Sequence, residues 1–215
     1  MMARPSRRLI VGISGASGIA YGIRALEVLR DVGIETHLVM TRSARVTLVQ
    51  ECGLSVSHVE KLSHTVHNID DIGASIASGS FATLGMIVAP CTIHSLSQIA
   101  TGVTANLLTR AADVVLKERR RLVLMVRETP LHLGHLRSMT QATEIGAVIM
   151  PPVPAFYPMP KTIDEIINHT IGRALDLFGI DSGLVQRWGE DIGPDTDGTS
   201  GKTRRSSKPA RALEL

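Results

Sequence analysis

Short apolar runs alternate with longer segments of helical periodicity along most of the chain, and this alternation restricts the fold more than any other feature. The apolar runs are Leu9–Ser14, Glu35–Met40, Met86–Ala89, Leu122–Val126 and Ala147–Met150, and most of them are apolar at nearly every position. That pattern is typical of strands buried on both faces of a parallel sheet. Helical patterns occupy Ala20–Asp31, Ser43–Glu51, His94–Ala100, Ala105–Lys117, His135–Glu144 and Ile163–Phe178. The sequence therefore predicts an α/β fold with a doubly wound parallel sheet, a three-layer sandwich of Rossmann-like or flavodoxin-like type, which binds ligands at the carboxyl ends of its strands.

Composition divides the chain into three parts. Residues 1–7 form a short basic extension, and residues 8–190 carry the alternating pattern and are long enough for one well-cored domain. Residues 191–215 are rich in Gly, Asp, Thr, Ser, Lys and Arg, which is typical of a disordered tail. The apolar stretch after the basic start is interrupted by Gly12, Ser14 and Gly15, so it is interpreted as a first strand and turn, not as a signal peptide.

Charge and cysteine content exclude several classes of partner. The formal net charge is +3, but the lysines and arginines between Lys202 and Arg211 contribute much of it, so we expect no nucleic-acid partner. No apolar run approaches the length of a membrane span. Cys52 and Cys91 are too few for a disulfide framework, which favours a cytoplasmic protein.

The first predicted strand ends in a loop of small residues, Gly15-Ala16-Ser17-Gly18, before a helix. Small residues let a ligand approach the backbone, and free amides at a helix start attract phosphate. The loop lacks the glycine spacing of a dinucleotide fingerprint, and no acidic residue ends the second strand. A mononucleotide therefore fits better than NAD, and a tight turn without a ligand remains the alternative.

Polar residues also follow the next two strands of the central pattern. Thr92 and Ser95 open a helix after the strand that ends near Ala89, where they can cap the helix, bind phosphate, or do both. Arg127 and Glu128 follow the strand Leu122–Val126, at the edge where α/β enzymes keep their chemistry. In the charged run 117–121 we expect Lys117 to lie on the inner side of the turn.

Two His-x-x-His pairs, His64/His67 and His132/His135, lack the third ligand of a zinc site. Asp70-Asp71 also lacks the third aspartate of the Asp-Asp-x-x-Asp motif that binds magnesium diphosphate. We therefore predict no metal.

Several segments in a fixed order resemble one enzyme family. They are Leu9–Gly18, Ala77–Ser80, Pro90–Thr92, Arg110–Arg119, Val126–Pro130 and Pro151–Tyr157, with Arg173 and Arg187-Trp188 near the end. From about Arg8 to Glu190 the chain resembles the UbiX flavin prenyltransferases. The resemblance implies a flavoprotein that joins the dimethylallyl group of dimethylallyl phosphate to N5 and C6 of reduced FMN. It also implies a homododecamer with its active site at a subunit interface, and a product that serves UbiD-type decarboxylases in ubiquinone biosynthesis.

The resemblance also implies the site residues. For FMN they are Gly15, Ala16, Ser17, Thr41, Thr92, Ile93, His94, Ser95, Arg110 and Arg127. For dimethylallyl phosphate they are Glu51, Lys117, Arg127, Glu128, Tyr157, Arg173 and Trp188. Arg110 and Glu51 match positions that neighbouring subunits often supply. Thr92 stands where Ser is common and Val126 where Pro is frequent, and neither departure removes a charge.

The residue types suit this chemistry. Loss of phosphate requires cations and donors where charge develops, and Lys117, Arg127, Arg173 and the Tyr157 hydroxyl provide them. Aromatic residues make up only 3% of the chain, so Phe156, Tyr157 and Trp188 are the candidates that face the allylic cation. We assign proton handling to Glu128 and Ser17, with Lys117 as the third catalytic residue.

Two other functions remain alternatives. The related FMN-dependent cysteine decarboxylases carry a Pro-Ala-Ser-Ala-Asn-Thr-like segment that this sequence lacks. An FMN carrier without catalytic activity would need no cluster of phosphate-binding residues beyond those for the flavin itself.

Overall fold

The computed structural model describes residues 7–193. These residues form two compact units, the first ending at Pro152 and the second beginning at Val153, and each is described by itself. The predicted extension 1–7 and tail 191–215 lie almost wholly outside the described residues.

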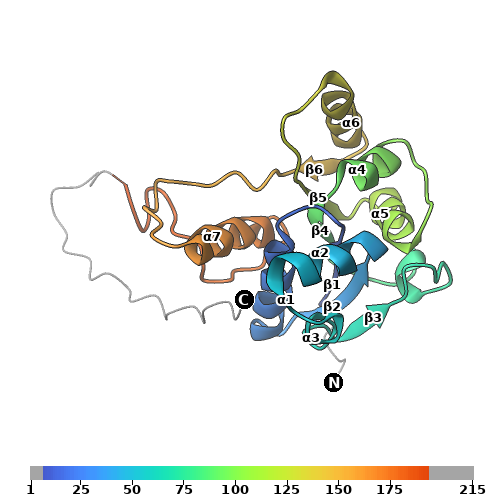
Figure 1. The fold of residues 1–215 in the computed structure, drawn as a ribbon, viewed down its shortest axis with the longest axis horizontal. Coiled ribbons are helices and arrows are strands. Elements are labelled where there is room, and N and C mark those ends of the chain that lie inside the picture. Colours follow the sequence, from blue (N-terminus) through green and yellow to red (C-terminus); the bar gives the residue numbers. More distant parts are fainter. Residues whose placement is uncertain (1–6, 194–215) are drawn as a thin grey trace. The chain divides into compact units, whose positions relative to one another are not determined.

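A six-stranded parallel sheet forms the centre of the first unit (Figure 1). Its strands are β1 (Arg8–Ile13), β2 (Glu35–Met40), β3 (Thr65–His67), β4 (Gly85–Cys91), β5 (Arg121–Val126) and β6 (Ala147–Ile149). They lie in the order β3-β2-β1-β4-β5-β6 with every neighbouring pair parallel. The direction of winding reverses between β1 and β4, which is the position where such sheets bind ligands. The predicted doubly wound fold is confirmed.

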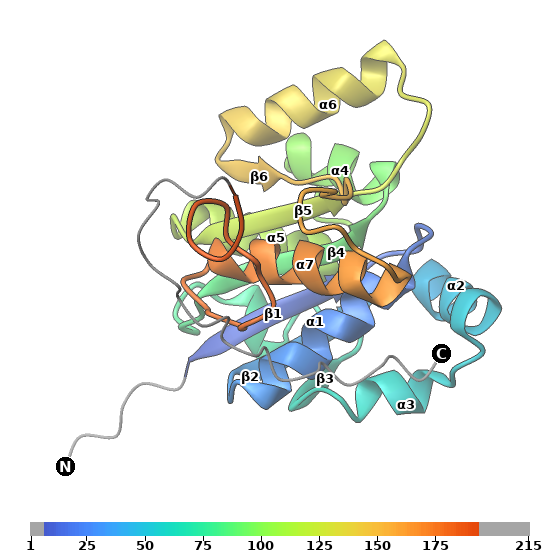
Figure 2. The same ribbon diagram turned by 90° about the vertical axis from the view of Figure 1, so that its left-hand side faces the viewer.

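Helices cover both faces of this sheet (Figure 2). In chain order the helices of the first unit are α1 (Ile19–Asp31), α2 (Arg42–Cys52), α3 (Val56–Glu60), the 3-10 turn η1 (Ser75–Ala77), α4 (Ile93–Ala100), α5 (Leu107–Lys117) and α6 (Leu133–Glu144). α1 lies on one face and α5 on the other, while α6 contacts α4 and β6.

The core explains why these runs become strands. Leu9, Val11 and Ile13 of β1 have no exposed surface, and Ile10 between them is almost as buried. Successive side chains point to opposite faces of a sheet, so a strand covered by helices on both sides must be apolar throughout. Burial of each such side chain contributes about 1.5–3 kcal/mol.

Three short elements, β3, α3 and the three-residue turn η1, were missing from the sequence prediction. β3 has three residues, two of them Thr65 and His67, and α3 has five, so neither shows a recognisable period. α5 begins at Leu107, two residues later than predicted, because Asn106 and Thr109 form a reciprocal capping box.

The second unit contains α7 (Ile163–Asp176), whose first turn is capped by the Thr162 hydroxyl. Asp164 and Glu165 lie in that first turn and Arg173 in the last, which complements the helix dipole. The predicted end at Phe178 is two residues too late.

Between residues 7 and 193 no helix combines the length and the apolar character that crossing a bilayer requires.

Candidate functional site

Ser14 joins the ends of β1 and β4 at the reversal point of the sheet. Its hydroxyl donates to the Pro90 carbonyl at 2.9 Å and accepts from the Thr92 amide at 2.8 Å. Its own amide donates to the same carbonyl at 3.1 Å. These bonds fix the position of the two loops that the sequence analysis assigned to the flavin, and Ser14 itself is buried.

The loop after β1 packs tightly against the start of α2. A Cβ placed on Gly15 would overlap the Ser43 side chain and lie 2.8 Å from the Ser43 carbonyl carbon, so this position requires glycine. Gly18 has a φ of 96° and precedes α1 without a side-chain cap on that helix. The first amides of α1 are therefore available to an acceptor from elsewhere.

That acceptor is Glu51, at the end of α2. Its Oε2 accepts from the Gly18 amide at 2.9 Å and the Ile19 amide at 3.1 Å. Burial by itself would raise the pKa of Glu51. The Ser17 hydroxyl, the two amides and the charge of Arg127 together lower that pKa below its usual value. Glu51 is thus an ionised group beside Ser17 of its own chain, although the resemblance associates it with a neighbouring subunit.

Hydroxyl groups cap the two other helices that begin at this edge. The Thr41 side chain accepts from the Ala44 amide at 3.1 Å, and the Thr92 side chain accepts from the Ser95 amide at 3.1 Å. The Thr92 hydroxyl in turn donates to Ser95 Oγ at 3.0 Å. Ile93 and His94 form the first turn of α4. α1, α2 and α4 therefore all direct their N-termini to the carboxyl edge of the sheet, a favourable place for an anion.

Arg127 and Glu128 lie at the same edge, after β5. The Arg127 amide donates to the Cys91 carbonyl at 3.0 Å, which ties this loop to the end of β4. Glu128 is exposed, and its Oε1 accepts from the Thr129 amide at 3.0 Å. Within residues 7–193 no ion pair joins Arg127 to Glu128, so the Glu128 carboxylate is not held by its neighbour.

Lys117 lies at the opposite edge of the sheet, at the end of α5 and before β5 begins. Its side chain is 47% exposed and pairs with Glu118, so the expectation that it points inward is wrong. The nearby Arg120 donates to the Gly79 carbonyl at 2.7 Å, so the segment Ala77–Ser80 meets the connection between α5 and β5 at this edge. Arg110 pairs with Asp113 along α5. The chain itself does not bring Lys117 to Arg127.

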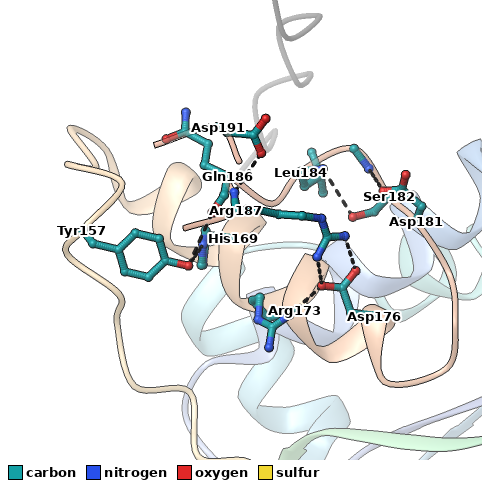
Figure 3. A network of polar contacts seen from close by, with 11 residues as sticks. Tyr157, His169, Arg173, Asp176, Asp181, Ser182, Leu184, Gln186, Arg187 and Asp191 are labelled. Carbon is teal, nitrogen blue, oxygen red and sulfur yellow. Dashed lines mark hydrogen bonds and ion pairs between the residues drawn. The ribbon is translucent and has the colours of Figure 1, made fainter. Parts of the chain in front are cut away.

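The second unit holds the remaining predicted residues Tyr157, Arg173 and Trp188, of which Figure 3 shows Tyr157 and Arg173. The Tyr157 hydroxyl lies 3.0 Å from His169 Nε2, and the Tyr157 ring meets the Trp188 ring edge to face at 5.8 Å. Arg173 donates to Asp176 at 2.7 Å, and Arg187 binds both oxygens of the same carboxylate at 3.0 Å. Burial would raise the pKa of Asp176, but its bonds to Arg187 and Arg173 lower it.

The two His-x-x-His pairs have separate roles. His64 contacts Thr36, whereas His67 hydrogen-bonds His37 at 3.0 Å. His132 Nδ1 accepts from the Gly134 amide at 3.0 Å and so caps α6. In the described part of the chain no three His, Cys, Asp or Glu side chains gather into a metal site.

Sequence reasoning missed two residues of this edge, Ser14 and Ser43. It named Glu51 but not the contact of that residue with Ser17 and the start of α1 in the same chain. A hydroxyl directly after the apolar run of β1 is a local signal for Ser14. The approach of Glu51 to the α1 N-terminus joins positions 33 residues apart, and no local pattern indicates it.

Sequence comparisons with known proteins also indicate a flavin-binding protein. Residues 2–174 match the family described as Flavoprotein. The chain is 63% identical over 185 residues to "Flavin prenyltransferase UbiX" of Escherichia coli K12, covering 85% of this chain and 98% of that protein. It is 60% identical over 181 residues to the protein of the same name from Thauera aromatica, covering 84% and 93% of the two chains.

Solved structures give the same result. The crystal structure of AnUbiX (PadA1) in complex with FMN and dimethylallyl pyrophosphate has a TM-score of 0.84 and 48% identity, covering 86% of this chain and 98% of that one. The dodecameric FMN-dependent UbiX-like decarboxylase of Escherichia coli O157:H7 has a TM-score of 0.82 and 45% identity, covering 84% and 98%. The FMN-dependent cysteine decarboxylase SpaF, at 21% identity and a TM-score of 0.54, shares the fold alone. This chain therefore belongs to the UbiX family of flavin prenyltransferases.

Proposed function

We propose that this protein joins the dimethylallyl group of dimethylallyl phosphate to N5 and C6 of reduced FMN. The observation that carries the proposal is the convergence of the N-termini of α2 and α4 with Ser14, Arg127 and Glu128 on the carboxyl edge of the sheet. Membership of a family of flavin prenyltransferases supports the same activity for this site.

The residues at this edge fit a flavin mononucleotide. The Gly15–Gly18 loop brings backbone close to a ligand, and the hydroxyls of Thr41, Thr92 and Ser95 sit at helix starts that favour a phosphate. Ala16 lies in the first loop, and Ile93 and His94 form the first turn of α4 beside it. Arg127 adds positive charge, and Arg110 would come from a neighbouring subunit. Reduced FMN supplies the nucleophilic N5 and the C6 position at which the new ring closes.

The chain's cations and donors serve the other substrate. As the bond between C1 of the prenyl group and its oxygen breaks, negative charge grows on the departing phosphate. Arg127, Lys117, Arg173 and the Tyr157 hydroxyl would stabilise that charge, and Glu128 would donate a proton to the phosphate oxygen. Tyr157 and Trp188, edge to face, offer aromatic surface to the developing allylic cation.

Ring closure requires a proton on C2 of the prenyl double bond, which makes C3 the electrophile that bonds to C6. It also releases a proton from C6, and the chain holds an acceptor for that proton. Ser17 hydrogen-bonds Glu51, whose lowered pKa keeps it ionised near neutral pH. An ionised carboxylate can take a proton through the Ser17 hydroxyl, which makes the Ser17–Glu51 pair our candidate for this step.

The site would be shared between subunits of an oligomer. Lys117 precedes β5 and Glu128 follows it, and the six residues of β5 separate them by about 20 Å at 3.3 Å per residue. Only a neighbouring copy can therefore bring Lys117 to the phosphate. We infer a dodecamer, as in the dodecameric UbiX-like structure from Escherichia coli O157:H7.

We further infer a cytoplasmic enzyme that delivers prenylated FMN to a UbiD-type decarboxylase in ubiquinone biosynthesis. Both cysteines are free thiols, which suits a reducing compartment, and burial raises the pKa of Cys91 to about 12, so that thiol is unreactive.

Mass spectrometry of the flavin tests the function directly. Anaerobic incubation with reduced FMN and dimethylallyl phosphate should yield a flavin heavier by one C5H8 unit, with equal yield in the presence of EDTA. Dimethylallyl pyrophosphate in a parallel reaction identifies the preferred substrate. Unchanged flavin with both substrates would contradict a prenyltransferase, and loss of product with EDTA would contradict a metal-free reaction.

A second experiment separates the two substrates. Tyr157→Phe and Arg173→Ala should raise the KM for dimethylallyl phosphate, by about 10-fold or more for the charged contact of Arg173, because each removes a donor to the phosphate. Flavin affinity, measured by fluorescence quenching, should remain unchanged. An equal loss of FMN affinity would contradict the proposal that the second unit binds the prenyl phosphate while the Gly15–Gly18 loop binds FMN.

A further inference from the structure

His169 is a buried imidazole in the second unit, on α7, and the sequence analysis gave it no role. Only 8% of its surface is exposed. Its Nε2 lies 3.0 Å from the Tyr157 hydroxyl, and the two rings meet edge to face at 5.4 Å (Figure 3). Tyr157 itself is 39% exposed, so its hydroxyl is anchored while the ring remains accessible.

Little else fixes the position of Tyr157. It lies in the stretch 151–161, which contains no helix or strand, and the backbone there forms one turn in which the Met159 amide donates to the Phe156 carbonyl. The remaining contacts of the Tyr157 side chain are the Gln186 carbonyl at 3.4 Å and the Trp188 ring. The bond to His169 is the shortest of these contacts and connects a loop residue to a helix.

The direction of that bond decides what Tyr157 can do. A phenol has one proton to donate, and its oxygen can also accept. If Nε2 carries no proton, it takes the phenol proton, and Tyr157 has none left for an anion. If Nε2 carries a proton, it donates to the phenol oxygen. The phenol proton, whose other acceptor in this structure is the Gln186 carbonyl at 3.4 Å, can then turn toward a phosphate.

The groups that face His169 favour a neutral ring. Burial lowers its pKa, and the charge of Arg173 lowers it further, while the Gln186 carbonyl and Asp176 act in the opposite direction. A neutral imidazole still carries one proton, which either nitrogen can hold. Tyr157 can therefore bind an anion without uptake of a proton from solvent.

We propose that His169 is a positioning residue: with its proton on Nε2, it holds the Tyr157 hydroxyl so that the phenol proton points at the phosphate of the prenyl substrate. This inference rests on the proposed function. α7 then organises both donors of the second unit, because Arg173 lies one helical turn after His169 on the same side of the helix.

Substitutions of His169 test the inference. His169→Leu should raise the KM for dimethylallyl phosphate by about 3- to 10-fold, the range for one lost hydrogen bond, without changing the FMN dissociation constant. His169→Gln keeps an N–H at a similar reach and should recover most of that loss. Thr170→Val is the matched control, because Thr170 is equally buried on α7 but bonds only the Ile166 carbonyl.

A double-mutant cycle distinguishes positioning from general disruption. In a Tyr157→Phe background, His169→Leu should have no further effect on that KM, since the bond it removes is already absent. An equal effect in both backgrounds, or a parallel loss of FMN affinity, would overturn the proposal.

Nitrogen NMR of the wild-type protein reports directly whether His169 Nε2 carries a proton. The measurement needs neither a folded variant nor catalytic turnover. On addition of dimethylallyl phosphate, the Nε2 signal of His169 should move to the position of a protonated nitrogen. A signal that stays at the position of a bare nitrogen would refute the proposal. If the wild-type protein makes no prenylated flavin, the proposed function fails, whereas normal turnover with an unaffected His169→Leu variant would reject only this inference.

Discussion

Replacement of Glu128 by Gln is expected to slow formation of prenylated flavin by about 10²–10⁴-fold, the usual contribution of a general acid. Glutamine keeps the shape of the side chain and an acceptor for the Thr129 amide, which Glu128 binds at 3.0 Å. It removes the titrating proton that would pass to the phosphate oxygen. The expected loss therefore lies in kcat, with little change in the affinity for either ligand.

Single-turnover measurements with saturating substrates isolate this step. The matched control is Glu144→Gln, an exposed glutamate at the end of α6 that lies outside the proposed machinery. Near-native turnover of a folded Glu128→Gln protein that binds both ligands would refute the acid role. The same loss in Glu144→Gln would show that the measurement reports a general effect of charge.

Mixed oligomers of Lys117→Ala and Glu128→Gln subunits are expected to recover activity that neither parent has. If Lys117 acts in the site of a neighbour, random mixing in equal amounts leaves about one site in four with both native residues, as the symmetry of a closed oligomer requires. If both residues act within one subunit, no mixed site is complete and no activity returns.

Co-expression with two different affinity tags provides the mixed particles. Tandem purification isolates those that contain both subunits, and each parent oligomer serves as the baseline. The separation of Lys117 from Glu128 by the full length of β5 is the reason to expect recovery. Mixed particles of native size without any regained turnover would show that Lys117 has no role across the interface.

The sequence predicted the long elements of the fold because burial on both faces leaves a strong apolar signature. β1, β4 and β5 are apolar at nearly every position, and β2, whose second half is apolar, has the bounds that were expected. β3 was missed because three residues, with His67 buried against His37, carry no such signature.

The site was predictable where it consists of loops that directly follow strands. Thr92 and Ser95 cap α4 as the pattern indicated. Lys117 was misplaced because helical periodicity gives the face of a helix, not the edge of the sheet at which the helix ends. The contacts of Glu51 with α1 and of Tyr157 with His169 depend on tertiary packing, which a single sequence does not reveal.

Glu51 at the start of α1 also has a consequence for cofactor selectivity. Sheets with this strand order commonly bind NAD or FAD, with the pyrophosphate seated on the amides of the first helix. Here the Gly18 and Ile19 amides already bind a carboxylate. The pyrophosphate of a dinucleotide would have to displace the Glu51 carboxylate or lie directly beside it, where the two negative charges repel each other. The chain thus carries its own anion at the position where a pyrophosphate would bind, which discriminates against dinucleotides before any contact with their second nucleotide is made.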